Sequence, residues 1–386
     1  MSERRILDID NLPGDILSLP ETMFEPALKQ DVGDEKFKTK PIGYFKDAFI
    51  RLNKNKIAMV SLYVIVLIIF MAIFAPYFND YSYVQQNVDL RDMPPRIPRL
   101  EKLGIANGRK IIQNRQLSSV QNPEMFPPDS ILQIRNERMV AGVPVVDVAV
   151  NYYIYKNAGD VYYWFGSDYL GRDLFTRLFR GARISLLIAF LSVMTNLVIG
   201  IVYGSIAGYY GGKVDLFMMR FVEVLDGLPY LVVVMLFMMV LGTGILSLVI
   251  ALTIMGWIGT AQLIRAQFYR FKGREYVLAA RTLGVPDKLL IFRHILPNSI
   301  GPIITRTMIA IPGAIFSEAF LAYIGLGLRA PETSIGVMLA DGQKVLLQSP
   351  YQTLFPAVLI SVLMISFNLF SNGLRDALNP TKRGTE

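Results

Sequence analysis

The sequence predicts an all-α integral membrane protein with six transmembrane helices and a small extracytoplasmic insert of β or irregular structure. The chain has 386 residues, 53% of them hydrophobic, and a mean hydropathy of +0.40. A soluble chain of this length rarely carries so many apolar residues, because its surface must remain wetted. The charged residues, 18% of the total, gather between long apolar segments. This arrangement is typical of helices that cross a bilayer.

Residue types that are scarce exclude several kinds of chemistry. The chain has no cysteine and a single histidine, His294, which excludes disulfides, thiolate catalysis and His or Cys metal clusters. The net charge of +8 matches the Lys and Arg excess that anchors the cytoplasmic ends of helices, and no nucleic-acid-binding motif accompanies it. No nucleophile–base set and no phosphate-binding Gly-rich loop is visible. We therefore expect no enzyme activity, no bound cofactor and no metal.

The N-terminal residues 1–56 are predicted to be a cytoplasmic tail that ends in an amphipathic helix. Met1–Lys40 is polar and lacks a signal-peptide pattern. Pro41–Ile50 places aromatic residues at helical spacing beside lysines, which is typical of a helix on the inner membrane face. Packing of this helix against the protein's own helices is the alternative.

The first transmembrane helix is predicted over residues 57–76. Ile57–Ala75 is continuously apolar, and about 19 residues are enough to cross the hydrocarbon core of a bilayer. Lys54 and Lys56 precede this segment and Pro76 ends it. Because positive residues favour the cytoplasmic side, the helix runs from inside to outside.

Residues 77–183 are predicted to form the extracytoplasmic insert and the segment that leads into the second helix. The region is polar and rich in proline, and Val140–Tyr155 combines β-branched and aromatic residues with partial alternation. That pattern predicts a strand or a hairpin. The basic residues of the region are compatible with an outside location, because long translocated loops are largely exempt from the positive-inside rule.

Five further apolar segments within residues 184–376 complete the predicted transmembrane core. They are Ile184–Ala207, Leu228–Leu241, Ile245–Ile264, Ile300–Leu326 and Leu354–Ser371. The second of these is short, and Phe217–Leu225 is expected to extend its helix inward. Glycine and proline recur inside the segments, which suits helices that pack closely and move. Six spans place both termini in the cytoplasm, with residues 377–386 as the C-terminal tail.

A polar loop, residues 265–299, separates two of these apolar segments. Its part Glu275–Pro297 carries Arg281, Lys288 and Arg293, which places the loop in the cytoplasm. A long, helix-prone cytoplasmic loop in a helical membrane protein predicts a docking surface for a soluble partner.

A motif in this loop resembles that of the inner-membrane subunits of binding-protein-dependent ABC importers. Their pattern is Glu-Ala-Ala, three residues, Gly, nine residues, then Ile-x-Leu-Pro. The matching residues here are Ala279, Ala280, Gly284, Leu296 and Pro297. Leu278 replaces the glutamate and His294 replaces the isoleucine. Glu275 lies one helical turn before Leu278 and is the candidate for the charged role.

The resemblance implies that the loop forms a helix-turn-helix that lies in a cleft of an ATPase subunit. Gly284 would end the first helix, and Pro286 would begin the second. Leu289, Leu290 and Phe292 are expected to supply apolar contacts. The residues expected to couple to the ATPase are Glu275, Ala279, Ala280, Arg281, Gly284, Pro286, Leu296 and Pro297.

Further motifs are similar to those of oligopeptide and dipeptide permease C-type subunits. They are Gly166–Asp173, Thr176–Arg177, Gly181–Leu186, the spaced residues between Pro312 and Gly342, and the C-terminal set Phe367–Leu369 and Gly373–Pro380. Ser167, Thr176, Arg180 and Ile335 depart from the usual residues of that group. The resemblance covers about 46–75 and 166–380, and the insert over residues 79–165 is longer than is usual for the group.

The resemblance implies a permease subunit of an ATP-driven importer of short peptides in the bacterial inner or plasma membrane. Its implied partners are a second permease subunit in a heterodimer, two ATPase subunits that hold ATP and Mg²⁺, and an extracytoplasmic peptide-binding protein. Close relatives with the same motifs carry nickel, glutathione or other small solutes, which leaves the cargo open. A secondary transporter is a different alternative, and it would require inverted repeats and intramembrane ion ligands that are not evident.

Two groups of charged residues are further candidates for function. Asp168, Arg172 and Asp173 lie just outside the second span, where they would contact the binding protein or form a gate; a turn with local ion pairs is the alternative. Arg306 and Glu318 lie about three helical turns apart in the fifth apolar segment. Because charges in lipid are costly, they are candidates for the translocation path, and positions near water at the two helix ends are the alternative.

Overall fold

The computed structural model describes residues 43–379. Residues 48–386 form one compact unit, and the remainder, Met1–Asp47, forms another. Of the tails predicted over residues 1–56 and 377–386, the parts 1–42 and 380–386 lie outside the described residues. The helices are α1 (Tyr44–Lys54), α2 (Lys56–Phe74), α3 (Leu117–Val120), α4 (Tyr152–Tyr155), α5 (Leu174–Tyr210), α6 (Gly212–Asp226), α7 (Tyr230–Leu241), α8 (Ile245–Gly256), α9 (Ile258–Phe271), α10 (Glu275–Thr282), α11 (Asp287–Leu289), α12 (Ile300–Leu321), α13 (Ile335–Lys344) and α14 (Tyr351–Leu378). The strands are β1 (Arg109–Gln116), β2 (Ile131–Val140) and β3 (Val143–Asn151).

Four described segments are long and apolar enough to cross a membrane as continuous helices. They are Lys56–Tyr77, Leu174–Tyr210, Asp287–Leu326 and Tyr351–Leu378. Two further helix pairs, α6 with α7 and α8 with α9, pass the same criterion together but are bent by 83° and 42°. The described part of the chain therefore has the six predicted spans if each bent pair counts as one.

The bend between α6 and α7 corrects one expectation. Phe217–Leu225 does not extend the helix of Leu228–Leu241, because the two helices meet at 83°. Gly227 and Pro229 lie at the break, and Pro229 has extended backbone geometry. A residue that precedes proline is pushed out of the helical region, so Leu228 ends the helical path there.

The longest helix, α5, begins at Leu174, ten residues before the predicted start at Ile184. Asp173 is its N-cap, and the Asp173 carboxylate accepts a hydrogen bond from the backbone N–H of Thr176 at 2.7 Å. Such a cap satisfies one of the free donors of the first turn. The polar residues that follow are therefore the first turns of the helix rather than a loop.

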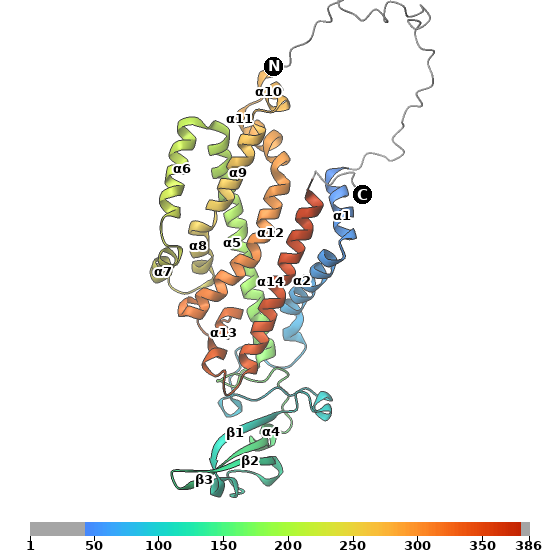
Figure 1. Cartoon of the computed structure of the whole chain (residues 1–386), viewed down its shortest axis with the longest axis vertical. Coiled ribbons are helices and arrows are strands. Elements are labelled where there is room, and N and C mark those ends of the chain that lie inside the picture. The colour runs from blue at the N-terminus through green and yellow to red at the C-terminus, as the bar shows by residue number, and fades with distance from the viewer. Residues whose placement is uncertain (1–42, 380–386) are drawn as a thin grey trace, which may run out of the picture. The chain divides into compact units, whose positions relative to one another are not determined.

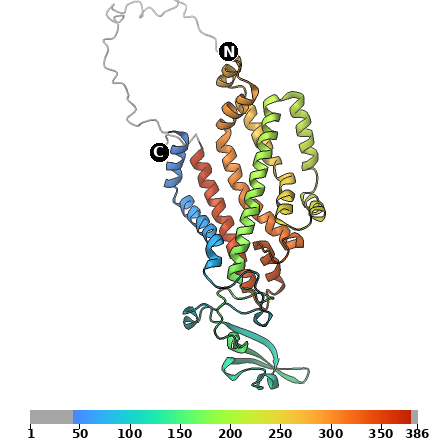
Figure 2. The same ribbon diagram turned by 180° about the vertical axis from the view of Figure 1, so that it is seen from behind.

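Helices α5 and α9 approach each other closely along a row of glycines. A Cβ atom at Gly204 would lie 2.4 Å from the carbonyl oxygen of Ala261, and one at Gly208 would lie 2.6 Å from Cβ of Phe268. Small residues spaced by four allow this backbone approach within a membrane. In addition, α2 and α14 lie side by side in both ribbon views (Figures 1 and 2). Ala58 near the start of α2 meets Gly373 near the end of α14.

Helix α1 reaches further than the predicted Pro41–Ile50, since it ends at Lys54. Its Leu52 is buried with Ala58 and Ala377, whereas Phe45 and Phe49 are 58% and 63% exposed. One face of the helix therefore packs against the protein's own helices, and the exposed aromatic side chains remain available to a membrane surface.

The insert contains a three-stranded antiparallel sheet in the order β1-β3-β2. Strands β2 and β3 form a hairpin through Ala141 and Gly142, which both have positive φ, as two-residue hairpin turns require. The predicted strand over Val140–Tyr155 ends at Asn151. Asn151 caps the short helix α4 by accepting from the N–H groups of Tyr153 and Ile154, so Tyr152–Tyr155 is helical.

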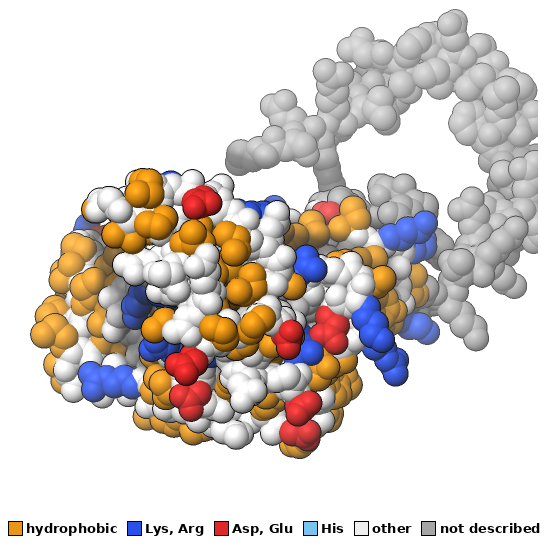
Figure 3. Space-filling view, turned by 90° about the horizontal axis from the view of Figure 1, so that it is seen from below, with side chains coloured by type: hydrophobic (Ala, Val, Ile, Leu, Met, Phe, Trp, Pro, Cys, Tyr) orange, Lys and Arg blue, Asp and Glu red, His pale blue; other side chains and the backbone are white. Residues whose placement is uncertain are grey.

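The sheet lies at the end of the residue 48–386 unit opposite to α10 and α11 (Figures 1 and 2). One face of β3 buries Val146, Val148 and Val150 against Phe126 and Val120. This small core is distinct from the clusters that hold the helices together. Viewed from this end, apolar side chains lie among separate acidic and basic groups, with no single sign of charge covering the face (Figure 3).

Candidate functional site

The loop over residues 265–299, called the coupling segment from here on, consists of short helices at one end of the helical unit (Figure 1). It takes in the end of α9, then α10 and α11, a π-turn over Leu290–Ile295 and a 3₁₀ turn over Leu296–Ser299. Helix α12 follows directly. The segment therefore has the two short helices and the intervening turn that its motif predicts.

The turn between α10 and α11 depends on Gly284, whose φ is +79°. The N–H of Val285 donates to the carbonyl of Ala280, and the N–H of Leu283 donates to the carbonyl of Ala279, both at 3.1 Å. These bonds pair the last free carbonyl groups of α10, and Gly284 has the left-handed backbone geometry with which glycine commonly ends a helix. Pro286 precedes α11 with φ of −67°. The expected helix-ending turn is thus present.

The coupling segment is anchored on the helical unit by an apolar underside. Val277, Leu290 and Ile295 are fully buried, and they pack in one cluster with Phe268 of α9 and Tyr209 of α5. The apolar contacts expected of Leu290 are therefore made within the protein's own core. Leu290 begins the π-helical stretch Leu290–Ile295, and its side chain faces the protein's own core.

The opposite face of the coupling segment exposes apolar side chains. The exposed fractions are 45% for Leu278, 84% for Leu283, 44% for Leu289 and 47% for Phe292. Large exposed apolar groups on a short polar segment indicate an interaction surface. The residues of the motif lie on or near this face: Glu275, Ala279, Arg281, Gly284, Pro286 and Pro297 are exposed, and Ala280 and Leu296 are half-buried.

Glu275 occupies the first turn of α10, and Leu278 follows it one turn later. A carboxylate in the first turn is favoured by the partial positive charge of the helix N-terminus. Both residues are exposed, so Glu275 is accessible in place of the missing glutamate at Leu278.

Asp168, Arg172 and Asp173 are buried, with exposed fractions of 3%, 2% and 2%. Asp168 pairs with Arg172 at 2.7 Å and also with Arg177 of α5. Burial raises the pKa of the Asp173 carboxyl, although hydrogen bonds from Thr176 and Asn79 oppose this shift. The structure therefore places these residues in a turn with local ion pairs, the alternative to a surface that contacts a partner.

Arg306 and Glu318 lie in different environments on α12. Glu318 is fully buried, and the Ser185 hydroxyl of α5 donates to it at 2.7 Å. Arg306 is exposed on the described chain, and its guanidinium lies against Gly259 of α9. A Cβ atom added at Gly259 would lie 2.6 Å from Nη2 of Arg306. The structure therefore does not bring these two side chains together.

The N-terminal end of α5 holds a group of contacts that sequence reasoning missed. Arg180 forms an ion pair with Glu332 at 2.9 Å, Arg177 donates to the Thr333 hydroxyl at 3.3 Å, and the Ser185 hydroxyl accepts from the N–H of Ile335 at 3.2 Å. These pairs are about 150 residues apart in the chain. Arg180 and Ile335 carried a signal, since both depart from the usual residues at their positions.

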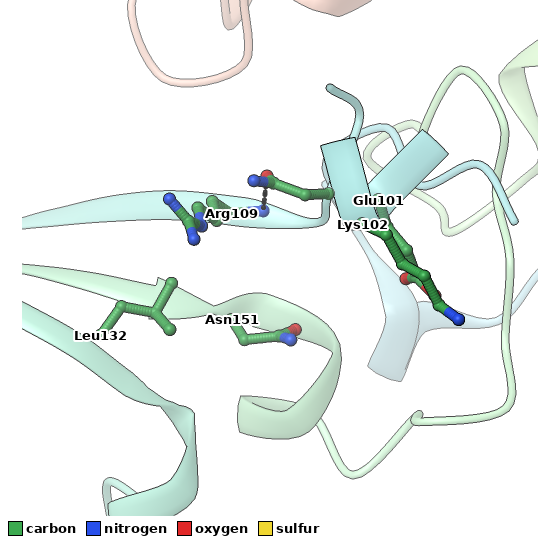
Figure 4. Close-up of a pocket in the computed structure, with 6 residues that line it drawn as sticks. Glu101, Lys102, Arg109, Leu132 and Asn151 are labelled. Carbon is green, nitrogen blue, oxygen red and sulfur yellow. Dashed lines mark hydrogen bonds between the residues drawn. The ribbon is translucent and has the colours of Figure 1, made fainter. Parts of the chain in front are cut away.

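Two adjoining hollows occupy the sheet end, with volumes of about 260 and 400 Å³. Both are lined by Arg109 and Leu132. Arg109 extends along the sheet, away from Glu101 and Lys102 (Figure 4), and Glu101 is paired with Arg96 at 2.7 Å. Within residues 43–379 no group of three or more His, Asp or Glu side chains is arranged to hold a metal ion.

Two family models match separate parts of the chain. Residues 200–384 match the model of the binding-protein-dependent transport system inner membrane component, and residues 43–95 match that of the N-terminal TM domain of oligopeptide transport permease C.

Three relatives show how far this similarity extends. The oligopeptide transport system permease protein OppC of Bacillus subtilis is 38% identical over 95% of this chain and 99% of its own length. The dipeptide transport system permease protein DppC of the same organism is 34% identical over 95% of this chain and 94% of its own length. The glutathione transport system permease protein GsiD of Pectobacterium atrosepticum is 34% identical over 60% of this chain and 78% of its own length.

Proposed function

This chain belongs to the family of binding-protein-dependent transport system inner membrane components, and on that premise we propose that it passes oligopeptides or dipeptides inward across a bacterial plasma membrane. It is a permease subunit of an ABC importer rather than an enzyme, so the hydrolysis of ATP belongs to separate subunits. The peptide cargo is supported by the relatives that cover the chain most fully.

The observation that carries this proposal is the exposed apolar face of the coupling segment. Leu283 follows the end of α10, Phe292 lies in the π-helix after α11, and both are exposed. The underside of the segment is anchored on α5 and α9. A rigid segment with an apolar outer face suits a cleft in a soluble partner. We assign this partner as one of two ATPase subunits that bind ATP and Mg²⁺, with Glu275, Ala279, Ala280 and Arg281 in the contact.

The remaining partners follow from the same premise. A second permease subunit would complete the translocation path, and an extracytoplasmic peptide-binding protein would deliver the peptide. Both termini are assigned to the cytoplasm. This assignment is supported by the contact of Ala58 in α2 with Gly373 in α14 and by the hydrogen bond from Arg51 to the carbonyl of Asn379 at 3.1 Å. Closure of the ATPase pair would shift the permease between inward- and outward-open populations.

The substitution Gly284→Pro tests the docking surface. Proline fixes φ near −65°, whereas Gly284 requires φ of +79° and donates its N–H to the carbonyl of Arg281 at 3.0 Å. The turn should therefore break at a cost of about 3 kcal/mol or more. We expect the variant to insert in the membrane but to lose both co-purification of the ATPase subunits and peptide uptake.

Gly104→Pro is the matched control for this substitution. Gly104 has φ of +80°, donates its N–H to the carbonyl of Glu101 at 3.1 Å and lies in the insert. The control should keep the ATPase subunits bound. Normal co-purification and uptake by the Gly284→Pro protein would refute docking at the coupling segment.

A second cargo, glutathione, is favoured by the similarity to a glutathione permease, and nickel and other small solutes are the further alternatives. Competition in uptake assays separates the candidates. An excess of unlabelled dipeptides or oligopeptides should abolish uptake of a labelled peptide, whereas glutathione or nickel should leave it unchanged. Uptake that persists with an inactivated ATPase would instead favour a secondary transporter.

A further inference from the structure

We propose that the Tyr209 hydroxyl is a positioning contact through which the coupling segment holds the inner end of α5, so that movement of the segment reaches the outer end of the protein through this one helix. The inference rests on the proposed function, because it takes the coupling segment as the ATPase docking site. It adds a residue and a route that are separate from the docking face.

Helix α5 needs such a contact because the chain does not join it to the coupling segment directly. Helix α9 runs into the coupling segment, and α12 follows the segment without a break. Both helices must therefore move with the segment, because the polypeptide chain joins them to it. Helix α5 ends at Tyr210, more than 60 residues before α10 begins. Only contacts between side chains and backbone groups can transmit a displacement of α10 and α11 to it.

Tyr209 supplies a contact to both short helices at once. Tyr209 is 6% exposed, and its hydroxyl donates to Oδ1 of Asp287, the first residue of α11, at 2.5 Å. The Arg281 guanidinium, in the last turn of α10, lies 5.4 Å from the centre of the same ring. A hydrogen bond to a carboxylate is stronger than one between neutral groups, and it fixes where α11 meets α5.

Helix α5 is suited to carry a displacement over the full thickness of the membrane. It has 37 residues with no break, which corresponds to about 55 Å at 1.5 Å per residue. By contrast, the spans built from α6 with α7 and from α8 with α9 are bent. Helix α12 contains Pro312, and a non-helical residue, Gly325, follows its end.

The outer end of α5 holds the segment that precedes α13. Arg180 pairs with Glu332, and Ser185 bonds both the N–H of Ile335 and the carboxylate of Glu318. A Cβ at Gly181 would lie 3.0 Å from the backbone of Ser334. A rotation or shift of α5 would therefore carry residues 332–335 with it.

The test is Tyr209→Phe in the assembled importer, with ATP hydrolysis and peptide uptake measured on the same vesicles. Phenylalanine keeps the ring in its buried site and removes only the hydroxyl. We expect unchanged co-purification of the ATPase subunits and a fall of about tenfold in peptide transported per ATP hydrolysed, the size expected when a hydrogen bond to a charged group is lost.

Two sets of variants control this experiment. Tyr210→Phe removes a hydroxyl from the adjacent residue, whose side chain is 55% exposed, and should leave the ratio unchanged. Asp287→Asn keeps an acceptor oxygen and should retain most of the coupling, whereas Asp287→Ala should lower the ratio as Tyr209→Phe does. A residue that served only stability would lower uptake and hydrolysis together through loss of protein and would leave the ratio unchanged.

Three outcomes would overturn the inference. They are an unchanged ratio in Tyr209→Phe, an equal fall in Tyr210→Phe, and loss of the ATPase subunits from Tyr209→Phe, which would make Tyr209 a docking residue. Failure of the proposed function is distinguishable, because the unmodified chain would then fail to co-purify with ATPase subunits at all.

Discussion

Glu318 gives a residue-scale prediction that concerns stability. The side chain is fully buried and accepts from the Ser185 hydroxyl, so Glu318→Ala leaves that hydroxyl without its acceptor and also creates a cavity. We expect a loss of about 2 to 4 kcal/mol in the free energy of unfolding. Glu318→Gln keeps the shape and an acceptor oxygen and should cost less than about 1 kcal/mol.

Thermal unfolding of the purified chain in detergent, followed by circular dichroism, compares the two Glu318 variants. Equal destabilisation by glutamine and alanine would mean that the negative charge, rather than the hydrogen bond, holds α12 to α5.

Whole elements were predicted best where composition alone decides the structure. Long apolar runs located α2, α12 and α14, because the hydrophobic length that a bilayer demands is visible in sequence. The start of α5 at Leu174 was not predicted, because its first turns carry the polar residues Thr176, Arg177 and Arg180, which are unusual in a membrane-spanning helix. Those side chains find partners in other elements, so the helix continues through them.

The turn of the coupling segment was predicted from a motif, and the inward orientation of Leu290 was not. The motif fixes the positions of the glycine and the proline, whereas Leu290 lies where α11 changes to π-helical geometry. A change from α to π geometry alters which face a residue occupies, and periodicity based on 3.6 residues per turn cannot register it.

Packing of α5 against α9 yields a prediction at the scale of elements. A Cβ at Gly204 would lie 2.4 Å from the carbonyl oxygen of Ala261, which is backbone and has little room to move. Gly204→Ala should therefore force the helices apart and lower the free energy of unfolding by about 1 to 3 kcal/mol.

Gly313→Ala is the matched control, because Gly313 also lies inside a membrane helix but no atom approaches its Cβ position within 4 Å. This substitution should be neutral, or stabilising by up to about 1 kcal/mol, through helix propensity. Melting temperatures of the two variants, measured side by side, separate a packing clash from a general effect of losing glycine. A Gly204→Ala protein as stable as the unmodified chain would contradict close α5–α9 packing.

At the scale of the residue 48–386 unit, the sheet and the coupling segment lie at opposite ends of the spans (Figures 1 and 2). Six spans and the positive-inside rule predicted this separation without any structure, because topology depends on charge and length. The insert was the least predictable part. Strands β1 and β2 are interrupted by the positive-φ residues Asn114 and Asn136, where the register shifts. Alternation is lost at such bulges.

The absence of cysteine from the sequence makes the orientation of the whole chain directly testable. Leu283 in the coupling segment is 84% exposed, and Leu103 in the insert is 73% exposed. Because both side chains face solvent, Leu283→Cys and Leu103→Cys should be tolerated, each with a change within about 0.5 kcal/mol. Each variant then carries a single thiol at one end of the unit.

A membrane-impermeant maleimide should label Leu103→Cys in intact cells and Leu283→Cys only after the membrane is opened. The unmodified chain, without a thiol, sets the background. Labelling of Leu283→Cys in intact cells would place the coupling segment outside, where no ATPase can reach it, and would reverse the assigned direction of transport.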